Sequence, residues 1–422
     1  MNLEGITHAH GELWTVKELF VYPNEFIVWS IQIVMYPYMT GLVAGAFVLS
    51  SLYHVFGQNQ LKNVATFSLA FSFCLLPVAM MPLQLHLQHP FRGIEVFFTP
   101  HFTSAIAAFG IVFTVYACIV ATEIWLVYRE FFVHEARRLR EEGKGIDKLR
   151  GLIYSALTLG AYDLSTEALH SDHKAAKIMA AIGIPVAAFL HGYAGFIFGS
   201  VKANALWMTP LMPVIFIMSA VVSGIALCML VYIGMLELGG MLAPKDLDRT
   251  ALWIKVKADQ HDVVSMTKKY LLMFLVAAIS LEILDLVFRG YTAVRSWDIL
   301  KEIIFDVDFV KIFVLQYFLG NFVPFIILLI PKVDIKGTIV ALALILFGVF
   351  MMRWNVVIGG QAFSLTFAGF MHYHLPIIPH DLETFKEGLF GALTVIATPF
   401  VLLALLHQII PVIPTYSKED IE

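Results

Sequence analysis

The chain has 422 residues, of which 59% are hydrophobic and only 14% are charged. Soluble domains carry about 25% charged residues, so this composition excludes a soluble protein and predicts an all-α polytopic membrane protein. A net charge of −4 without a basic stripe argues against a nucleic-acid partner. The three cysteines, Cys74, Cys118 and Cys228, lie in apolar runs without metal-ligand spacing, which argues against a zinc or iron–sulfur site in this chain.

The N-terminal segment, residues 1–25, contains acidic residues and no apolar core, so we expect an outer segment and not a cleavable signal peptide. A transmembrane domain follows at 26–410, and 411–422 form a cytoplasmic tail. About nine stretches (eight to ten) in this domain are long and apolar enough to span a bilayer. They are 26–56, 64–82, 102–128, 176–198, 209–237, 269–289, 309–330, 336–353 and 388–410.

The distribution of lysine and arginine predicts how the chain is oriented in the cytoplasmic (inner) membrane. The loops at 129–175 and 245–269 are richer in basic residues than the loops that alternate with them, so both are placed in the cytoplasm. The N-terminus is then outside and the C-terminus inside. Within the first of these loops, 149–169 has helical apolar spacing but is too polar to span, and we expect one amphipathic helix on the cytoplasmic surface.

Polar side chains collect at the predicted outer ends of helices that are far apart in the sequence. Polar groups at membrane depth cost several kcal/mol each unless they are paired, and interleaved glycines allow close packing around them. A ligand with a polar head and an apolar tail at the membrane edge, such as a quinone, suits both features. The residues concerned are Gln32, Tyr36, His86, His89, Arg92, His101, His191, Tyr193, Lys202, Asn204, Arg353, Asn355 and Gln361.

Several of these residues have a simpler interpretation. Interfacial histidine and tyrosine often serve as headgroup anchors, which applies to His101, Tyr38, His372 and His374, and Arg353 can snorkel to the interface. His86 and His89 share a helix face, and His191 with either of them would suit a bis-histidine haem. The residues alone leave that alternative open.

A second set of ionisable residues is predicted in mid-membrane or toward the inner side. Intramembrane acids often mark proton or ion paths, although a paired structural acid or a helix-end position explains them equally simply. Glu282 and Asp285 are three residues apart and share one helix face. The candidates for a proton path are His54, Glu123, Glu237, Glu282 and Asp285.

Four separated motifs resemble the NrfD/PsrC family of quinone-interacting membrane subunits of respiratory complexes. They are YPYMTGLVAGA at 36–46, HGYAGFIFG at 191–199, TPLMPVIF at 209–216 and RWNVVIGGQ at 353–361. The resemblance extends over about residues 24–410. The extended C-terminal half and the YDLS loop at 162–165 look most like the DsrP/HmeB branch, from redox complexes of sulfur metabolism.

The resemblance implies two four-helix bundles plus an extra helix, with no haem, metal or iron–sulfur cluster in this chain. It also implies a menaquinone or other quinone as substrate near the outer face. A ferredoxin-like iron–sulfur subunit would lie beside it on that face, with further cytochrome or catalytic subunits in the complex. Tyr193 matches the family's tyrosine beside the quinone, and Arg353 matches a basic residue near the site. His89 lies in the polar turn after the second helix, where Phe91 replaces the acid that many members have.

These features predict quinone or quinol oxidoreductase activity within a complex of several subunits. His89 or His191 exchanges the proton, Tyr193 hydrogen-bonds the head group, and Arg353 stabilises the developing anion. Turnover is electrogenic if protons come from the cytoplasm through the second set, and electroneutral if they are exchanged only outside. Three other functions stay open: an ion or solute transporter, a haem b membrane anchor, and a purely structural anchor for partner subunits.

Overall fold

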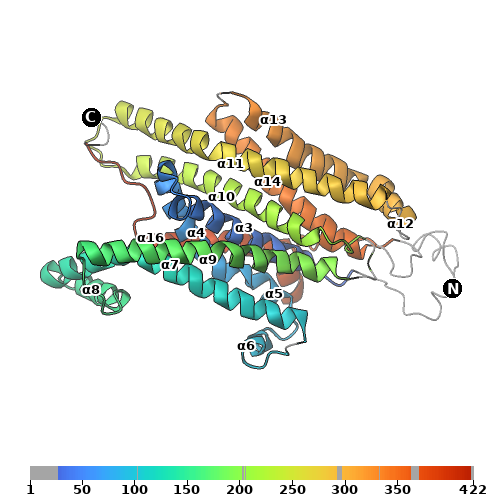
Figure 1. Cartoon of the computed structure of the whole chain (residues 1–422), viewed down its shortest axis with the longest axis horizontal. Helices are drawn as coiled ribbons and strands as arrows, with labels where there is room; N and C mark the ends of the chain where they lie inside the picture. The colour runs from blue at the N-terminus through green and yellow to red at the C-terminus, as the bar shows by residue number, and fades with distance from the viewer. Residues whose placement is uncertain are drawn as a thin grey trace.

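The computed structural model describes residues 27–101, 103–201, 204, 206–291, 297–331, 333–362 and 370–419. Within these ranges nine helices are long and apolar enough to cross a membrane, which confirms the all-α polytopic prediction (Figure 1). The main elements are α3 (Ile31–His54), α4 (Lys62–Ala79), α7 (Ala105–Glu142), α9 (Thr166–Gly199), α10 (Met212–Leu242), α11 (Arg249–Tyr291), η4 (Val310–Phe322) continued by α13 (Val323–Leu329), α14 (Ile335–Trp354) and α16 (Leu389–His407).

Short helices lie between and beyond these spans. They are η1 (Asn59–Leu61), α5 (Met81–His86), η2 (Pro90–Ile94), α6 (Glu95–Phe98), α8 (Ile146–Leu157), α12 (Trp297–Glu302), η3 (Ile303–Val307), η5 (Asn355–Gly359) and α15 (Leu382–Glu387). Successive spans alternate in direction. We call the two ends of the molecule the Trp29 end, where α3 begins, and the His54 end, where α3 finishes. In Figure 1, α12 lies at the Trp29 end, and α8 and the C-terminus lie at the His54 end.

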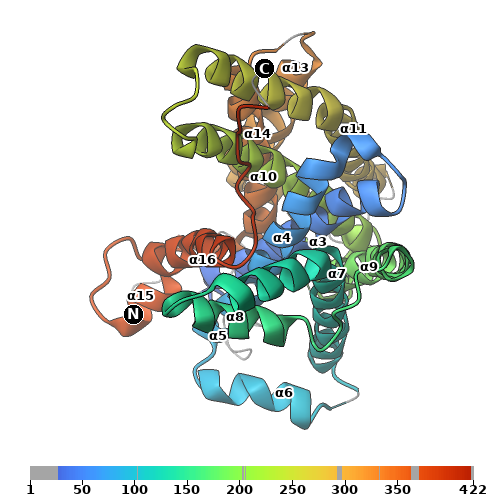
Figure 2. The ribbon, with the colours of Figure 1, turned by 90° about the vertical axis from the view of Figure 1, so that its left-hand side faces the viewer.

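The spans form two groups around the contact between α3 and α10. Helices α3, α4, α7 and α9 pack together, α10 packs with α11 and α14, and η4 packs against α14. Helix α16 packs against α4 and α3, so the last span joins the first group. Figure 2, seen from the His54 end, shows α10, α11 and α14 together on one side and α7, α8 and α9 on the other.

The two groups meet so closely that only glycine fits at the crossing of α3 and α10. A Cβ on Gly45 would lie 2.1 Å from the carbonyl oxygen of Ala220, and one on Gly224 would lie 2.4 Å from the Cα of Gly45. Small residues of this kind allow membrane helices to approach backbone to backbone. The crossing therefore sets the distance between side chains carried by the two groups.

The seventh span is a π-helix over most of its length, where the sequence predicted a regular helix. Pro324 at the start of α13 has no backbone N–H, so the bond that would join it to the preceding turn is missing. Gly320, in the last turn of η4, packs against Gly348 of α14, where an added Cβ would lie 2.2 Å from the Gly348 Cα. The wider helix turns the side chains of η4 toward α11 and α14.

The amphipathic helix predicted at 149–169 is wrong as a single element. Helix α8 ends at Leu157, Leu159 and Gly160 have left-handed φ angles of 51° and 82°, and Thr166 begins α9. Buried Arg129 holds this loop, because it donates to the carbonyls of Ala161 and Asp163 at 2.9 and 2.8 Å. A loop at 158–165 thus divides the predicted helix, and only its last residues, 166–169, lie in the first turn of a long spanning helix.

Candidate functional site

A buried cluster joins the two helix groups near the Trp29 end, and His191 and Arg353 are its centre. The Nη2 of Arg353 lies 2.9 Å from Nε2 of His191 and donates to Oγ of Ser219 at 2.7 Å and to the Phe216 carbonyl at 3.3 Å. Oγ1 of Thr40 lies 3.4 Å from Nδ1 of His191. Four helices, α3, α9, α10 and α14, each supply one side, and we call Thr40, His191, Ser219 and Arg353 the arginine cluster.

These contacts fix the tautomer of His191. A guanidinium only donates, so Nε2 of His191 must accept, and the neutral ring carries its proton on Nδ1. That proton faces Thr40, whose hydroxyl donates onward to the Tyr36 carbonyl at 3.0 Å. The ring can therefore take up a proton at Nε2 only if Arg353 moves away.

Arg353 is fully buried, with no exposed surface. Its guanidinium carbon lies 3.7 Å from the ring centroid of Phe216, and its Nη1 lies 3.1 Å from the sulfur of Met352. None of the ion pairs found among the described residues includes it. A buried cation held only by neutral groups is costly, so this arginine is well placed to attract an anion.

An apolar cavity of about 490 Å³ extends from His191 toward the His54 end. Its walls run along α3 from Ala44 to Leu52 and along α9 from Ile184 to His191, about 10–12 Å at the helical rise. Helices α10 and α11 close it with side chains such as Val221 and Phe274. One end of this cavity is thus a hydrogen-bonded histidine, while most of the remaining wall is hydrocarbon.

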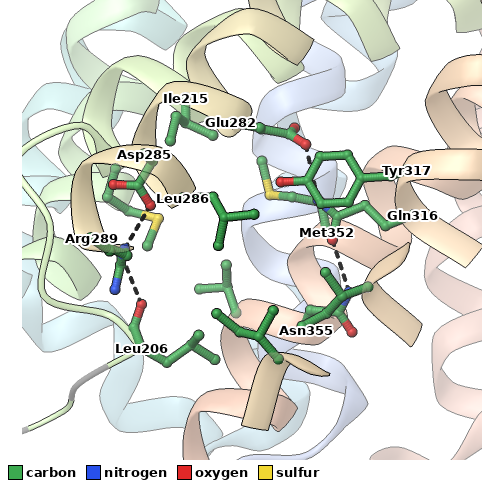
Figure 3. Close-up of a pocket in the computed structure, with 14 residues that line it drawn as sticks. Leu206, Ile215, Glu282, Asp285, Leu286, Arg289, Gln316, Tyr317, Met352 and Asn355 are labelled. Carbon is green, nitrogen blue, oxygen red and sulfur yellow. Dashed lines mark hydrogen bonds and ion pairs between the residues drawn. The ribbon is translucent and has the colours of Figure 1, made fainter. Parts of the chain in front are cut away.

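A second cavity, of about 110 Å³, lies on the other side of α14, between α11 and η4 (Figure 3). Glu282 accepts hydrogen bonds from the amides of Gln316, at 3.0 Å, and Asn321, at 3.3 Å. Asn355 in turn donates to Gln316 Oε1 at 2.8 Å. Figure 3 shows Glu282, Gln316 and Asn355 on one side of the cavity and Asp285 with Arg289 on the other.

Asp285 and Arg289 form an ion pair one helical turn apart, at 2.8 Å. Asp285 also accepts from Thr209 Oγ1 at 2.5 Å, and Arg289 donates to the Leu206 carbonyl at 3.1 Å. The two predicted acids therefore have different surroundings, because Asp285 has a cation beside it and the donors to Glu282 in the described structure are both amides. Both lie within ten residues of the end of α11 at Tyr291, which is close to the Trp29 end.

His86 belongs to a separate contact at the Trp29 end. Its Nδ1 lies 3.0 Å from Oε2 of Glu387, which also accepts from the Ser30 hydroxyl. Gln32 donates to the Lys386 carbonyl next to it. Partial burial raises the pKa of Glu387, but the hydrogen bonds from His86 and Ser30 outweigh it and hold the pKa below its usual range. We call Ser30, His86 and Glu387 the Glu387 clasp, which ties the start of α3 to α5 and α15.

Asn204 and Gln361 tie loops together at the same end. Asn204 donates to the Gly360 carbonyl at 2.6 Å, and Gln361 accepts from the Trp29 backbone N–H at 2.9 Å. The rings of Trp29 and Trp207 stack at 5.3 Å between them. These contacts cover the Trp29 end of the arginine cluster. Lys202 lies outside the described residues.

Other predicted head-group residues lie away from the arginine cluster. His89, Arg92 and His101 are exposed on or beside η2 and α6. Tyr193 is partly buried and packs between Phe189 and Phe196, and it forms no hydrogen bond among the described residues. The structure thus brings His191 together with Arg353 but does not bring His89 or Tyr193 into the same hydrogen-bonded group. Tyr36 is buried, packs edge-on against Phe109, and contributes its carbonyl.

The remaining proton-path candidates are dispersed. Glu123 is fully buried, and neither of its carboxyl oxygens has a hydrogen-bond partner among the described residues. His54 lines a cavity of about 240 Å³ at the His54 end with Asp172 and His173. Glu237 is exposed, so it is not part of a buried path in this structure.

The sequence analysis missed Thr40, Ser219, Gln316, Asn321 and Glu387. Gln316 and Asn321 had a detectable signal, since two amides five positions apart in an apolar span need partners. Asp285 and Arg289 also had one, because opposite charges at i and i+4 pair on a helix. Thr40 and Ser219 had none, because small hydroxyl residues are common in membrane helices and usually bond their own backbone.

Comparison with known proteins agrees with this architecture. Residues 22–239 match the family described as "Polysulphide reductase, NrfD". The chain is 33% identical over 217 residues to a subunit of the selenate reductase of Mesobacillus selenatarsenatis, covering 50% of this chain and 49% of that one.

More distant relatives match over a similar stretch. A membrane subunit of the putative dimethyl sulfoxide reductase of Halobacterium salinarum is 25% identical, over 49% of this chain and 43% of its own. The protein NrfD of Escherichia coli is 24% identical, over 49% and 60%. The chain thus spans about half the length of the curated relatives it matches. The family match covers more than half of the sequence, and the chain belongs to the NrfD family of membrane proteins.

Proposed function

We propose that this chain is the quinone-binding membrane subunit of a larger redox complex. A quinone or quinol head group lies against His191 and Arg353, and the isoprenoid tail occupies the apolar cavity. The single observation that carries this proposal is the position of His191 at the end of an otherwise largely apolar cavity, where it is held by a buried arginine that pairs with no carboxylate of the described residues. The ligand implied has one polar end and one apolar end.

The arginine cluster supplies two kinds of group that quinol chemistry needs. Oxidation of a quinol releases two protons and two electrons. Nε2 of His191 accepts the first proton as Arg353 moves off that nitrogen, and the second proton leaves by one of the routes described below. Arg353, which lies 2.9 Å from the same nitrogen, then faces the oxygen that has lost its proton. One movement thus provides both the base and the stabilising charge. Reduction runs through the same contacts in reverse.

The electrons pass to or from an iron–sulfur cluster of a ferredoxin-like partner subunit. His191 lies eight residues, about 12 Å of helix, from the end of α9 at Gly199. A partner subunit bound at the Trp29 end is therefore closer to His191 than one bound at the His54 end. Relatives with reductase-subunit names support such a complex. We propose that this end faces outward, that the quinone is menaquinone, and that the complex belongs to the DsrP/HmeB branch of sulfur metabolism.

Proton transfer has two candidate routes. Buried Glu123 and half-buried His54 lie on the helices of the first group, toward the His54 end, and support a route from that side. If protons enter by that route, turnover is electrogenic. If they are exchanged only at the Trp29 end, turnover is electroneutral.

The experiment compares variants of the intact complex in nanodiscs, using menadiol-dependent turnover and binding of a hydroxyquinoline N-oxide quinol analogue. His191→Ala should lower turnover by about 100-fold or more and weaken analogue binding, since a positioned base contributes 10²–10⁴-fold. Arg353→Lys should keep the charge but lower turnover, because lysine cannot make the same fork of bonds. His134→Ala, an exposed histidine near the His54 end, is the matched control. Wild-type binding and turnover in His191→Ala would overturn the proposal.

A further inference from the structure

The wall of the small cavity beside Glu282 contains more polar side chains than helix packing alone requires. Three π-helical segments contribute to its wall: η3 through Ile304, η4 through Gln316 and Tyr317, and η5 through Asn355 and Val356. π-Helical turns are rare and are found mostly at functional sites. The family match ends at residue 239, so every one of these segments lies beyond it.

Glu282 is almost completely buried, at 8% exposure, and Arg353 is completely buried. Neither side chain forms an ion pair, within hydrogen-bonding range, with any of the described residues. The carboxylate of Glu282 and the guanidinium of Arg353 nevertheless attract each other, because they carry opposite charges. Two buried opposite charges that share no other counter-ion compensate one another through the protein.

Only a few residues separate Glu282 from Arg353. Met352, next to Arg353, lines the Glu282 cavity and also touches the guanidinium through its sulfur. Asn355, two positions beyond Arg353, is bonded to Gln316, which donates to Glu282. Helix α14 therefore presents Arg353 to the arginine cluster and Met352 to the Glu282 cavity, and η5, which follows α14, reaches Glu282 through Asn355 and Gln316.

The other charged and titratable groups around Glu282 already have partners or are neutral. On α11, Asp285 is paired with Arg289. From η4, Tyr317 is a neutral phenol at physiological pH. Helix α10 contributes only Met212 and Ile215 to this wall. Arg353 is thus the cation whose charge Glu282 balances.

We infer that Glu282 and an anionic quinol-type head group share Arg353 as their counter-ion, so that binding the anion and protonating Glu282 are coupled. The inference rests on the proposed function, because it needs a head group at His191. When the anion forms beside Arg353, Glu282 loses its compensating charge and takes up a proton. When the anion leaves, Glu282 releases that proton and again balances Arg353. No electron moves in this step, and one proton enters for each anion bound.

Coupling of this kind is reciprocal, which makes it measurable from either site. The probe is again the hydroxyquinoline N-oxide, a weak acid whose anion resembles a deprotonated quinol. Its binding to the intact complex in nanodiscs is titrated against pH. Proton uptake on binding is measured by calorimetry in two buffers of different ionisation enthalpy.

Glu282→Gln keeps the size and hydrogen-bonding shape of the side chain and removes its charge. In this variant the probe anion should bind about tenfold more tightly, the order of magnitude expected when one like charge is removed from the same protein interior. Proton uptake on anion binding should fall from close to one proton in the wild type to near zero. Asp285→Asn is the matched control on the same helix, and its shift should be smaller because Arg289 already balances Asp285.

The outcomes separate the two proposals. Failure of the wild-type complex to bind the probe would remove the proposed function itself. Binding without proton uptake in the wild type would remove only the coupling, and this measurement needs no variant to fold. An equal shift in Glu282→Gln and Asp285→Asn would indicate a general field effect and would likewise overturn the shared counter-ion. A tenfold gain in probe affinity in Glu282→Gln but not in Asp285→Asn, together with the loss of proton uptake, supports the shared counter-ion.

Discussion

Arg353 donates to Nε2 of His191 at 2.9 Å, although the two residues are 162 positions apart in the sequence. The contact crosses from α14 to α9 and passes over α10, where Ser219 and Phe216 complete the surroundings of the guanidinium. It keeps the histidine neutral, and none of the carboxylates in the described part of the chain pairs with the arginine. The predictions below test this contact and the packing that positions it.

Removing the Ser219 hydroxyl should destabilise the protein. Ser219→Ala leaves a buried, charged donor of Arg353 without its 2.7 Å partner, which costs about 1–3 kcal/mol of unfolding free energy. Thermal unfolding of the detergent-solubilised protein measures the loss. Ser200→Ala, at an exposed serine just after α9, should leave the midpoint unchanged. Equal unfolding midpoints for Ser219→Ala and the wild type would show that the hydrogen bond from Arg353 to Ser219 does not stabilise the protein.

The crossing of α3 and α10 should not tolerate a side chain. Gly45→Ala places a methyl group 2.1 Å from the Ala220 carbonyl, so the helices must separate, at a cost of about 1–3 kcal/mol. Because this separation shifts Thr40 relative to Ser219, analogue binding should weaken as well. Gly234→Ala on α10 is the control, since nothing lies within 4 Å of the added carbon. The expected order is a lower unfolding midpoint for Gly45→Ala and an unchanged or higher one for Gly234→Ala.

The Glu387 clasp should stabilise the protein in a pH-dependent way. Hydrogen bonds from His86 and Ser30 lower the pKa of Glu387 in the folded state from its ordinary 4.5. The stabilisation is therefore complete above pH 4.5 and disappears as the pH falls through the folded-state value. Glu387→Gln should unfold at a lower temperature than the wild type at pH 7, and the difference should narrow below about pH 4.5.

A control for this pH dependence lies on the same short helix. Glu383 is exposed on α15, so Glu383→Gln should match the wild type at every pH. A gap between Glu387→Gln and the wild type that stays constant down to pH 3 would show that the carboxylate itself is not responsible.

The ion pair of Arg129 and Asp172 should matter more than a surface pair near it. Arg129 is only 3% exposed, so Asp172→Asn leaves a buried charge without its partner and should cost about 3 kcal/mol or more. Asp147→Asn removes the partner of Arg150 in a pair that is half exposed, and little change is expected. The midpoints of thermal unfolding of the two variants are compared. A larger loss in Asp147→Asn than in Asp172→Asn would refute the stabilising role of the buried pair of Arg129 and Asp172.

The predicted orientation can be tested with single cysteines. Phe91 is 92% exposed in the connection that precedes α7, and Leu149 is 60% exposed on α8 in the connection that follows it, so one membrane span separates the two positions. An outside N-terminus predicts that a membrane-impermeant maleimide labels Phe91→Cys in intact cells and labels Leu149→Cys only after lysis. The reverse pattern would show that the Trp29 end faces the cytoplasm.

The apolar runs were enough to predict the number and order of the spans, because a membrane helix must satisfy its backbone internally and expose hydrocarbon. They also gave His191, Arg353, Glu282 and Asp285 as residues to examine, because each is a polar group inside such a run. The lengths of α9 and α11 were underestimated, since both helices continue out of the apolar stretch that defines a span. The break at Leu159 and Gly160 was missed for the same reason, as it falls where hydrophobic spacing carries little information.

Composition and spacing by themselves therefore determined that this is an all-helical membrane protein with ionisable groups inside its spans. Only the tertiary structure decided which of those groups meet. The close crossing of Gly45 and Gly224 brings Thr40 of α3 and Ser219 of α10 into one cluster. The π-turns of η4 and η5 carry Gln316, which donates to Glu282, and Asn355, which donates to Gln316. The pairing of His191 with Arg353, of His86 with Glu387 and of Asp285 with Arg289 depends on helix rotation and distance, which a single sequence does not contain.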